Sequence, residues 1–164
     1  MISPKVAIFV DGANVDIASK TARIGINYVL LKIFLAKARP IAIANYYNSK
    51  AKDVAERAFY AQVENADFQL VCGPRKTENR SQKEIDVQIA VDMVSEAYDN
   101  SFGVAVLVSG DGDLAPAVRK LVSMKKEVEV ASFDDPKRRE FSWSLKTAAT
   151  RTIDLTANIL KIKL

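Results

Sequence analysis

The stretch VAIFVDGAN at residues 6–14 decides the fold of this chain, because its apolar run stops abruptly at Asp11. The stretch VAVLVSGDGD at residues 104–113 repeats the pattern, since a similar run leads into Ser109, Asp111 and Asp113. Continuous valine-rich runs of this length are typical of parallel strands buried on both faces. Ligands of open α/β sheets bind at the carboxyl ends of such strands. The two stretches therefore predict a cluster of acids at one edge of a parallel sheet.

Strand and helix patterns alternate along the chain, which predicts a parallel sheet covered by helices on both faces. The predicted strands are residues 5–10, 41–47, 68–72, 104–109 and 127–132, with a short terminal strand at 151–153. The predicted helices are residues 27–38, 51–64, 84–98, 113–123 and 138–147, and a last helical turn is expected after Asp154. Residues 15–26 lack clear periodicity and are expected to form a turn of helix and a loop.

These patterns predict an α/β fold of the Rossmann-like kind, a three-layer sandwich around a mostly parallel sheet of five or six strands. The chain has 164 residues, a length that suits one domain with a full hydrophobic core. We therefore expect a single domain over residues 1–164. Residues 73–83 interrupt the alternation with a polar loop that follows a strand and so emerges at the acidic edge of the sheet.

The composition excludes several kinds of enzyme. The chain has no histidine and one cysteine, Cys72, which rules out Ser-His-Asp and Cys-His catalysis, His-ligated zinc and an intrachain disulfide. The apolar neighbours of Cys72 predict a buried strand cysteine. Carboxylate, hydroxyl, amide and ammonium groups remain for chemistry, and they suit a metal ion bound by oxygen.

The chain carries a mild excess of positive charge, with a formal net charge of +4. This balance favours a polyanionic partner such as nucleic acid. No apolar stretch approaches the length that spans a membrane, and the N-terminus lacks the pattern of a signal peptide. We therefore expect a cytoplasmic protein without membrane contact. Phe141, Trp143 and Leu145 alternate with polar residues, which fits either core packing or the contact of a homodimer.

Asp86 is the most informative acid by geometry, because it projects near the middle of the apolar stripe of its predicted helix, in the first turn. The stripe is formed by Ile89, Ala90, Met93, Val94 and Ala97. Buried carboxylates are paired or bind a metal ion, so Asp86 is expected to join the acids that follow the two strands. Asp92 lies off the centre of the stripe and is expected at the surface or bonded to a neighbouring loop.

The resulting cluster comprises Asp11, Asp86, Asp111 and Asp113, and carboxylates this close repel one another unless a cation neutralises them. Mg²⁺ or Mn²⁺ suits ligation by oxygen alone, and such a site can activate water against a phosphodiester. Three of the acids also have a structural interpretation, whereas Asp111 has no such simple explanation. Asp11 and Asp113 could cap the helices that follow them, and Asp86 could stabilise its helix dipole.

Basic and polar side chains near the cluster are candidates for contacts with substrate. Lys83 lies one turn before Asp86 and could neutralise a phosphate oxygen, or it could be a solvated lysine. The polar loop contributes Arg75, Lys76 and Arg80, which could contact phosphates or simply face solvent. Asn14 could cap a turn or place its carboxamide near a metal ion or phosphate.

Three motifs together resemble the NYN domain family, in its LabA-like branch, which belongs to the PIN-like nuclease superfamily. They are FVDGAN at residues 9–14, KEIDVQIAVDM at 83–93 and VSGDGDLAP at 108–116. Two departures concern packing: Leu114 stands where an aromatic residue is common, and residues 124–126 lack the glycine expected before the next strand.

The resemblance implies a PIN-like sheet with the acids at the carboxyl ends of its strands and a metal-dependent endoribonuclease acting on RNA, expected to be single-stranded. The metal-binding and catalytic acids would be Asp11, Asp86, Asp111 and Asp113. Asn14 and Ser109 would orient substrate or acids, and Lys83 would contact phosphate.

Other functions stay open. The chain could be an RNA-binding or regulatory module with little turnover, which would use Arg75, Lys76, Arg80 and the basic residues 137–139 on phosphates. It could also be a phosphohydrolase in which Asp11 forms a covalent intermediate. A dinucleotide-binding enzyme is disfavoured, because the turn after the first strand lacks the glycine fingerprint and carries negative charge.

Overall fold

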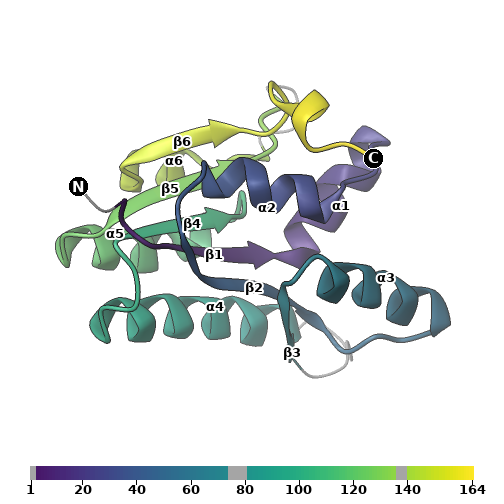
Figure 1. Ribbon diagram of the computed structural model, residues 1–164, viewed down its shortest axis with the longest axis horizontal. Coiled ribbons are helices and arrows are strands. Elements are labelled where there is room, and N and C mark those ends of the chain that lie inside the picture. Colours follow the sequence, from purple (N-terminus) through teal and green to yellow (C-terminus); the bar gives the residue numbers. More distant parts are fainter. Residues whose placement is uncertain (1–2, 74–80, 136–139) are drawn as a thin grey trace.

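The computed structural model describes residues 3–73, 81–135 and 140–164, and in this part of the chain six strands form one sheet (Figure 1). The strands are β1 (Val6–Asp11), β2 (Ile41–Ser49), β3 (Gln69–Gly73), β4 (Val104–Val108), β5 (Glu127–Ser132) and β6 (Arg151–Asp154). Their order is β3-β2-β1-β4-β5-β6, and every neighbouring pair is parallel. The predicted Rossmann-like architecture is confirmed, with six strands.

Helices cover both faces of the sheet and make it the middle layer of three (Figure 1). One face carries α1 (Gly12–Ala22), α2 (Tyr28–Ala36) and α3 (Val54–Asn65). The other carries α4 (Ser81–Tyr98), α5 (Ala115–Ser123) and α6 (Trp143–Ala148). Two short 3₁₀ turns are η1 (Gly112–Leu114) and η2 (Ile159–Lys161).

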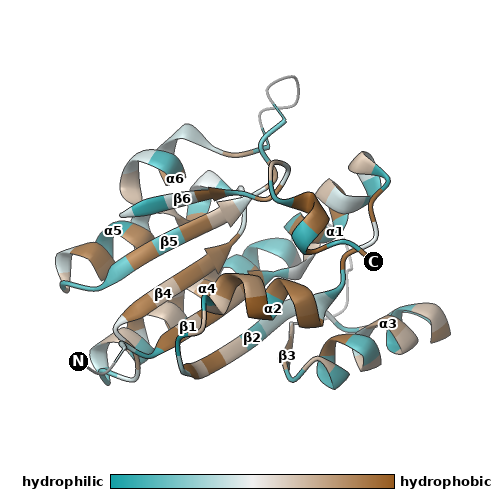
Figure 2. Cartoon of the chain, turned by 45° about the horizontal axis from the view of Figure 1, so that its top comes forward, coloured by the Kyte–Doolittle hydropathy of each residue, from teal (hydrophilic) through white to brown (hydrophobic). Residues whose placement is uncertain are grey.

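The pleat of β1 explains how a single apolar run serves two cores. Val6, Ile8 and Val10 face the first set of helices, whereas Ala7 and Phe9 face the second, and all five are fully buried. Burial on both faces is why the run is continuous rather than alternating. Figure 2 shows the same hydrophobic character along β4, the partner of β1.

The strand order creates a topological switch point between β1 and β4. The chain builds β2 and β3 on one side of β1 and then crosses to place β4 on the other side. Helices that follow β1 and β4 therefore lie on opposite faces, which opens a crevice at the carboxyl ends of these two strands. Asp11 ends β1, and residues 109–113 follow β4, so the predicted acids lie at this crevice.

Three local predictions were wrong. Residues 15–26 are mostly helical, because α1 begins at Gly12 under the cap of Asp11 and buries small side chains such as Ala13 and Ala18. The polar loop predicted over residues 73–83 ends earlier, since α4 begins at Ser81. Cys72 is exposed, because it lies near the end of the edge strand β3.

A buried charge cluster ties the end of α2 to the sheet. Glu129 in β5 is 1% exposed and forms ion pairs of 3.0 Å with both Lys37 and Arg39. Burial alone would raise the pKa of Glu129, but the hydrogen bonds and charges of Arg39 and Lys37 outweigh it and lower this pKa. Lys37 and Arg39 thus keep the Glu129 carboxylate ionised inside the core.

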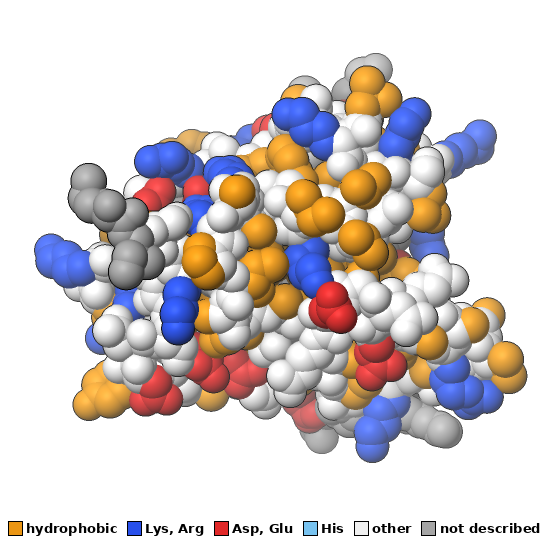
Figure 3. Space-filling view, viewed as in Figure 1, with side chains coloured by type: hydrophobic (Ala, Val, Ile, Leu, Met, Phe, Trp, Pro, Cys, Tyr) orange, Lys and Arg blue, Asp and Glu red, His pale blue; other side chains and the backbone are white. Residues whose placement is uncertain are grey.

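The outer surface of α2 is unusually apolar for a helix on the face of a sheet. Val29 and Ile33 are 47% and 61% exposed, and Figure 3 shows hydrophobic side chains gathered over α2. Among the described helices, none is both long enough and apolar enough to cross a membrane. Phe141 and Leu145 are buried, whereas Trp143 is exposed, so the alternation noted in the sequence belongs mainly to the core.

Candidate active site

Asp11 is a buried acid that also caps a helix. It ends β1 and is only 1% exposed. One carboxylate oxygen accepts the backbone N–H of Asn14 at 3.1 Å, which caps α1, and the other accepts the hydroxyl of Ser109 at 2.9 Å. Burial raises the pKa of Asp11 and the charge of Asp111 adds to it, against the lowering effect of the hydrogen bonds with Asn14 and Ser109. These two hydrogen-bond donors therefore fix the orientation of the Asp11 carboxylate.

Side-chain bonds join the end of β1 to the loop that follows β4. The Ser109 hydroxyl donates to Asp11 and accepts the backbone N–H of Asp111 at 3.1 Å. The Asn14 carboxamide oxygen accepts the backbone N–H of Gly110 at 2.9 Å. We refer to these contacts among Asp11, Asn14, Ser109 and Gly110 as the switch-point frame. The frame holds two segments that lie almost a hundred residues apart in the chain.

Asp111 and Asp113 follow the frame on a tight turn. Asp111 caps the turn η1, since its carboxylate accepts the backbone N–H of Asp113 at 2.9 Å. Asp113 is exposed and does not cap α5, which begins at Ala115 with Pro116 in its first turn. The plain capping interpretation of Asp113 is therefore wrong, and its carboxylate stays at the rim of the crevice.

Asp86 approaches the same group of acids from α4. It is half-buried, and the Gln82 side-chain amide donates to it at 3.2 Å. Burial is the main cause that raises the pKa of Asp86 from 3.8 to about 6, and the negative charges of Asp11, Asp111 and Asp113 add to it. Asp86 therefore lies within electrostatic reach of the three other predicted acids.

The chemistry of these donors suits a hard divalent cation, because all four are carboxylates. Within residues 3–73, 81–135 and 140–164, however, no three His, Cys, Asp or Glu side chains lie close enough to share one ion. The types of donor fit a cation such as Mg²⁺ or Mn²⁺.

The predicted substrate contacts are only partly visible. Lys83 lies exposed on the first turn of α4, one turn before Asp86. Arg75, Lys76 and Arg80 lie outside the described residues. The basic residues 137–139 also lie outside them, since the described chain resumes at residue 140.

Three glycines and a serine-rich segment shape the site. The glycines at 110 and 112 predict a sharp turn and close approach to a ligand, but the sequence did not indicate their contact with residues 140–144. A Cβ atom on Gly110 would overlap the backbone oxygen of Glu140, and the Ser142 N–H donates to the Gly110 oxygen at 3.0 Å. A Cβ atom on Gly112 would lie 2.6 Å from the Ser142 hydroxyl. A Cβ atom on Gly12 would overlap the ring of Tyr46. The signal in the sequence is the pair of glycines around Asp111, which permits this close approach.

The helix that bears Asp86 is anchored to the sheet by a second acid. Asp92 accepts the hydroxyl of Tyr47 at 2.9 Å and the side-chain amide of Gln88 at 2.6 Å. Asp92 was expected at the surface or bonded to a neighbouring loop, but its partner Tyr47 lies on the strand β2. Nothing in the local sequence identifies Tyr47 as that partner.

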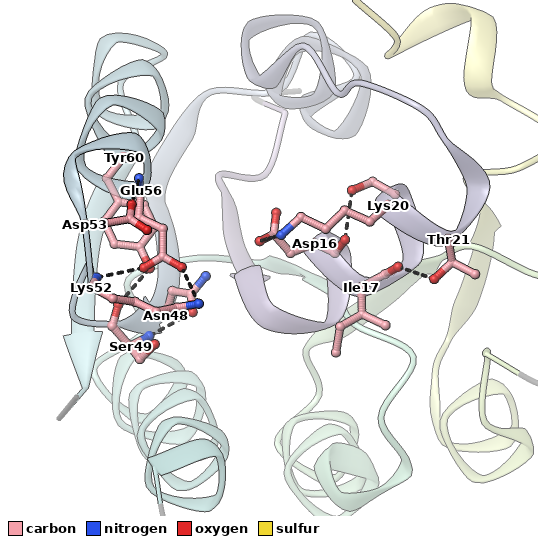
Figure 4. Close-up of polar contacts among 11 residues, drawn as sticks. Asp16, Ile17, Lys20, Thr21, Asn48, Ser49, Lys52, Asp53, Glu56 and Tyr60 are labelled. Atoms are coloured by element: carbon pink, nitrogen blue, oxygen red, sulfur yellow. Dashed lines mark hydrogen bonds and ion pairs between the residues drawn. The ribbon is translucent and has the colours of Figure 1, made fainter. Parts of the chain in front are cut away.

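A small polar pocket of about 100 Å³ lies on the other side of the β2 end, between α1 and α3 (Figure 4). Its charges neutralise each other locally. Lys20 pairs with Asp16 at 3.2 Å, and Lys52 pairs with Glu56 at 3.1 Å. This pocket therefore offers no excess of either charge to a ligand, unlike the acidic crevice at the switch point.

The geometry disfavours a covalent aspartyl intermediate. A nucleophilic carboxylate needs a free oxygen that faces the substrate, but Asp11 is buried and each of its oxygens accepts a hydrogen bond. Asp86 and Asp111 are both less buried than Asp11. The arrangement suits acids that hold a cation or orient water better than it suits an attacking carboxylate.

Comparisons with known proteins agree with the fold and the motifs. The sequence matches the family described as NYN domain over residues 5–156. The chain is also similar to the crystal structure of a protein of unknown function, VPA0982, from Vibrio parahaemolyticus, with a TM-score of 0.82. Sequence identity is 23%, over 99% of this chain and 97% of that one, so this likeness concerns the fold alone.

Two further comparisons carry no argument. An alcohol dehydrogenase from a halo-thermophilic archaeon of a Red Sea brine pool matches 95% of this chain and 45% of that one, at 12% identity. Its TM-score of 0.28 is too low to support a shared fold. No curated protein matches the sequence.

Proposed function

Because this chain belongs to the NYN domain family, which is grouped with the PIN-like nucleases, we propose that it is a ribonuclease that depends on Mg²⁺ or Mn²⁺. The observation that carries the proposal is the switch-point frame, which fixes Asp11 beside Ser109 at 2.9 Å and so brings acids from β1 and from the loop after β4 to one crevice. The substrate would be single-stranded RNA, cut at a phosphodiester bond by water.

The four acids would share the work of holding the cation. Asp11, Asp86 and Asp111 are the proposed ligands, and Asp113 at the rim would complete the set. A divalent cation bound there would neutralise charge on the phosphodiester and lower the pKa of an attacking water. Asp86, with a pKa of about 6, would be mostly ionised at neutral pH, and a cation that offsets the neighbouring charges would lower this pKa.

The remaining residues would position acids and substrate. Ser109 would keep Asp11 in one orientation, in the way that outer hydrogen bonds orient metal ligands in other proteins. Asn14 would hold the Gly110 backbone against the start of α1. Lys83 is the proposed phosphate contact, and its exposure at the start of α4 leaves its ammonium group free to reach a bound strand.

The proposal also includes the basic side chains of Arg75, Lys76 and Arg80 as further phosphate contacts, on the strength of the sequence alone. The same holds for membership of the LabA-like branch, for a single domain over residues 1–164 and for a cytoplasmic location. The homodimer expected from residues 141–145 is not part of the proposal, because Phe141 and Leu145 pack in the core.

The direct experiment incubates purified protein with 5′-labelled and 3′-labelled single-stranded RNA and Mn²⁺, and compares wild type with Asp111→Asn. We expect wild type to release products with a 5′-phosphate and the variant to be slower by about 100-fold or more. Asp99→Asn is the matched control, because Asp99 is exposed beyond the end of α4. Equal rates for wild type and Asp111→Asn would contradict the proposal.

One observation favours a second candidate, an RNA-binding or regulatory module with little turnover. No three acids among the described residues lie close enough to share an ion, which is what a chain without a metal site would also show. The two candidates differ in the experiment above. A binding module would retain RNA with every acid-to-amide variant and would cleave with none, including wild type.

A further inference from the structure

A pocket of about 410 Å³ lies at the carboxyl ends of β2 and β3, on the face of the sheet that α4 covers. Its walls come from the ends of β2 and β3 and from the first two turns of α4. The lining includes Lys50, Cys72, Glu84, Ile85 and Gln88. Its volume falls within the range of small-molecule sites in proteins, roughly 300–1,000 Å³.

The pocket is built by a close approach of β3 to α4. A Cβ atom on Gly73 would lie 2.7 Å from the Ile85 side chain, so the end of the strand touches the first turn of the helix. The Lys50 N–H donates to the Gly73 oxygen at 3.3 Å and holds the segment after β2 against the same strand. The floor of the pocket is thus fixed by backbone rather than by long side chains.

The chemistry of the walls suits a nucleobase. Val71, which is half-buried, supplies apolar surface for the flat face of a ring, and the rim carries hydrogen-bonding groups. The Gln88 amide nitrogen donates to Asp92 at 2.6 Å, which orients its carbonyl oxygen as an acceptor. Glu84 adds a carboxylate. Two acceptors favour a base that bears an exocyclic amine, such as adenine or cytosine, over uracil.

The position of the pocket connects it to the proposed cleavage site. Ile85 lines the pocket, and the next residue, Asp86, faces the acids of the crevice. Lys50 on the rim is exposed and places an ammonium group where a phosphate of the same strand would pass. An RNA duplex keeps its bases stacked and paired, so only an unpaired strand can insert one.

We propose that this pocket binds one nucleobase of single-stranded RNA, next to the phosphate that lies at the acidic crevice. The proposal rests on the proposed function for the position of the scissile phosphate. The pocket itself is defined independently by its walls, so binding there can be measured without cleavage.

A thiol on the pocket face of β3 provides the measurement, because Val71 faces α4 and lines the pocket, whereas the side chain of Cys72 lies toward α3. The test uses the variant Asp111→Asn with Val71→Cys, Cys72→Ser and Ser123→Cys, in Mg²⁺ at pH 8.5. Ser123 ends α5 at the opposite edge of the sheet and is exposed, so the thiol introduced there is an internal control. Both thiols react with N-ethylmaleimide, and peptide mass spectrometry gives the two rates.

With single-stranded oligoadenylate at ten times its dissociation constant, we expect labelling of the thiol introduced at Val71 to slow by about tenfold. Labelling of the thiol introduced at Ser123 should change by less than about twofold. Oligouridylate at the same saturation should protect the thiol at Val71 less. Equal protection by both oligonucleotides would contradict the roles given to Glu84 and Gln88.

A second variant pair tests the rim. Lys50→Glu should weaken RNA binding and lower the salt dependence of the dissociation constant by about one phosphate contact. Lys52→Glu is the matched control, because Lys52 already pairs with Glu56 on the α3 side of β2. An equal effect of both variants would contradict the role of Lys50.

The outcomes separate this proposal from the nuclease proposal. Unchanged labelling of the thiol introduced at Val71 while fluorescence anisotropy reports bound RNA would overturn the pocket and leave the nuclease proposal standing. Protection of that thiol in a protein whose wild type does not cleave RNA would support the pocket and reject the nuclease. Absence of any RNA binding would overturn both.

Discussion

Replacing Asp86 with asparagine should make the protein more stable while it removes the proposed activity. Burial, followed by the charges of Asp11, Asp111 and Asp113, raises the pKa of Asp86 from 3.8 to about 6. A shift of about two units corresponds to roughly 3 kcal/mol at about 1.4 kcal/mol per unit. Asp86 is only half-buried, so solvent screening reduces this figure to about 1–2 kcal/mol. The neutral amide of asparagine avoids that cost.

The sign of the pH dependence follows from the direction of the shift. Below pH 3.8 the carboxyl group is protonated in both the folded and the unfolded chain, so it does not change stability. Between pH 3.8 and 6 the unfolded chain loses the proton first, and the folded state of the wild type becomes progressively less stable. Above pH 6 the cost is constant. The advantage of Asp86→Asn should therefore be largest above pH 6 and shrink toward pH 4.

The assay is thermal unfolding in EDTA, followed by circular dichroism between pH 4 and 8. A gain of 1–2 kcal/mol should raise the midpoint of Asp86→Asn by roughly 2–8 °C at pH 7.5 in a chain of this size. The exposed control Asp99→Asn should shift it by less than about 1–2 °C. Mg²⁺ should then raise the midpoint of wild type more than that of Asp86→Asn, because the cation offsets the same repulsion.

A stability difference that does not vary between pH 4 and 7.5 would refute this reasoning. It would mean that Asp86 does not feel the charges of the other acids, and that α4 presents it to solvent. A loss of stability at pH 7.5 would refute it as well, since it would show that the Asp86 carboxylate is favourably paired in the folded protein.

Three further changes have defined outcomes. Glu129→Gln should lower the free energy of unfolding by about 3 kcal/mol, because it leaves two cations beside a neutral amide in the core. Its control in chemical denaturation is Glu127→Gln, which removes an exposed pair with Arg151 and should cost less than about 1 kcal/mol. Gly110→Ala should lower the free energy of unfolding by about 1–3 kcal/mol and disturb the site, because the added methyl group meets backbone atoms. Its control in the same denaturation series is Gly25→Ala, whose methyl group meets only the side chain of Leu164. Lys125→Gly should stabilise the fold by about 0.5–1 kcal/mol. Lys125 has a φ of 63°, and this left-handed conformation is unfavourable by about 1 kcal/mol for a residue with a side chain. An unchanged denaturation midpoint would contradict that account.

Much of the fold could be predicted from local patterns. The apolar runs at residues 6–10 and 104–108 form the central strands β1 and β4, as predicted. The position of Asp86 on the stripe of α4 also predicted its approach to the acids. These predictions succeed because burial on both faces of a strand, or along one stripe of a helix, leaves a direct mark on the sequence.

Other features depend on position in the sheet, which local sequence does not encode. The apolar neighbours of Cys72 predicted burial, yet β3 is an edge strand and the thiol is exposed. The helix α1 was missed because it buries small residues and lacks a strong apolar stripe. The glycine expected at residues 124–126 is replaced by Lys125, which adopts the left-handed conformation itself.

The switch-point frame could not be predicted in detail, because its bonds join segments far apart in the chain. The sequence left Asn14 as either a cap or a ligand to metal or phosphate. The structure shows instead that its carboxamide accepts the N–H of Gly110. The bond between Ser109 and Asp11 likewise spans 98 positions. Only the strand order brings these partners together.

The double duty of Asp11 has a consequence for how such a domain can diverge. Asp11 caps α1 as well as facing the crevice, so a lineage that lost it would forfeit about 1 kcal/mol of helix capping. Loss of Asp86 would instead relieve repulsion. In a descendant that is no longer selected for catalysis, Asp86 on α4 is therefore expected to be replaced first. Asp11 on β1 is expected to persist because it still caps α1.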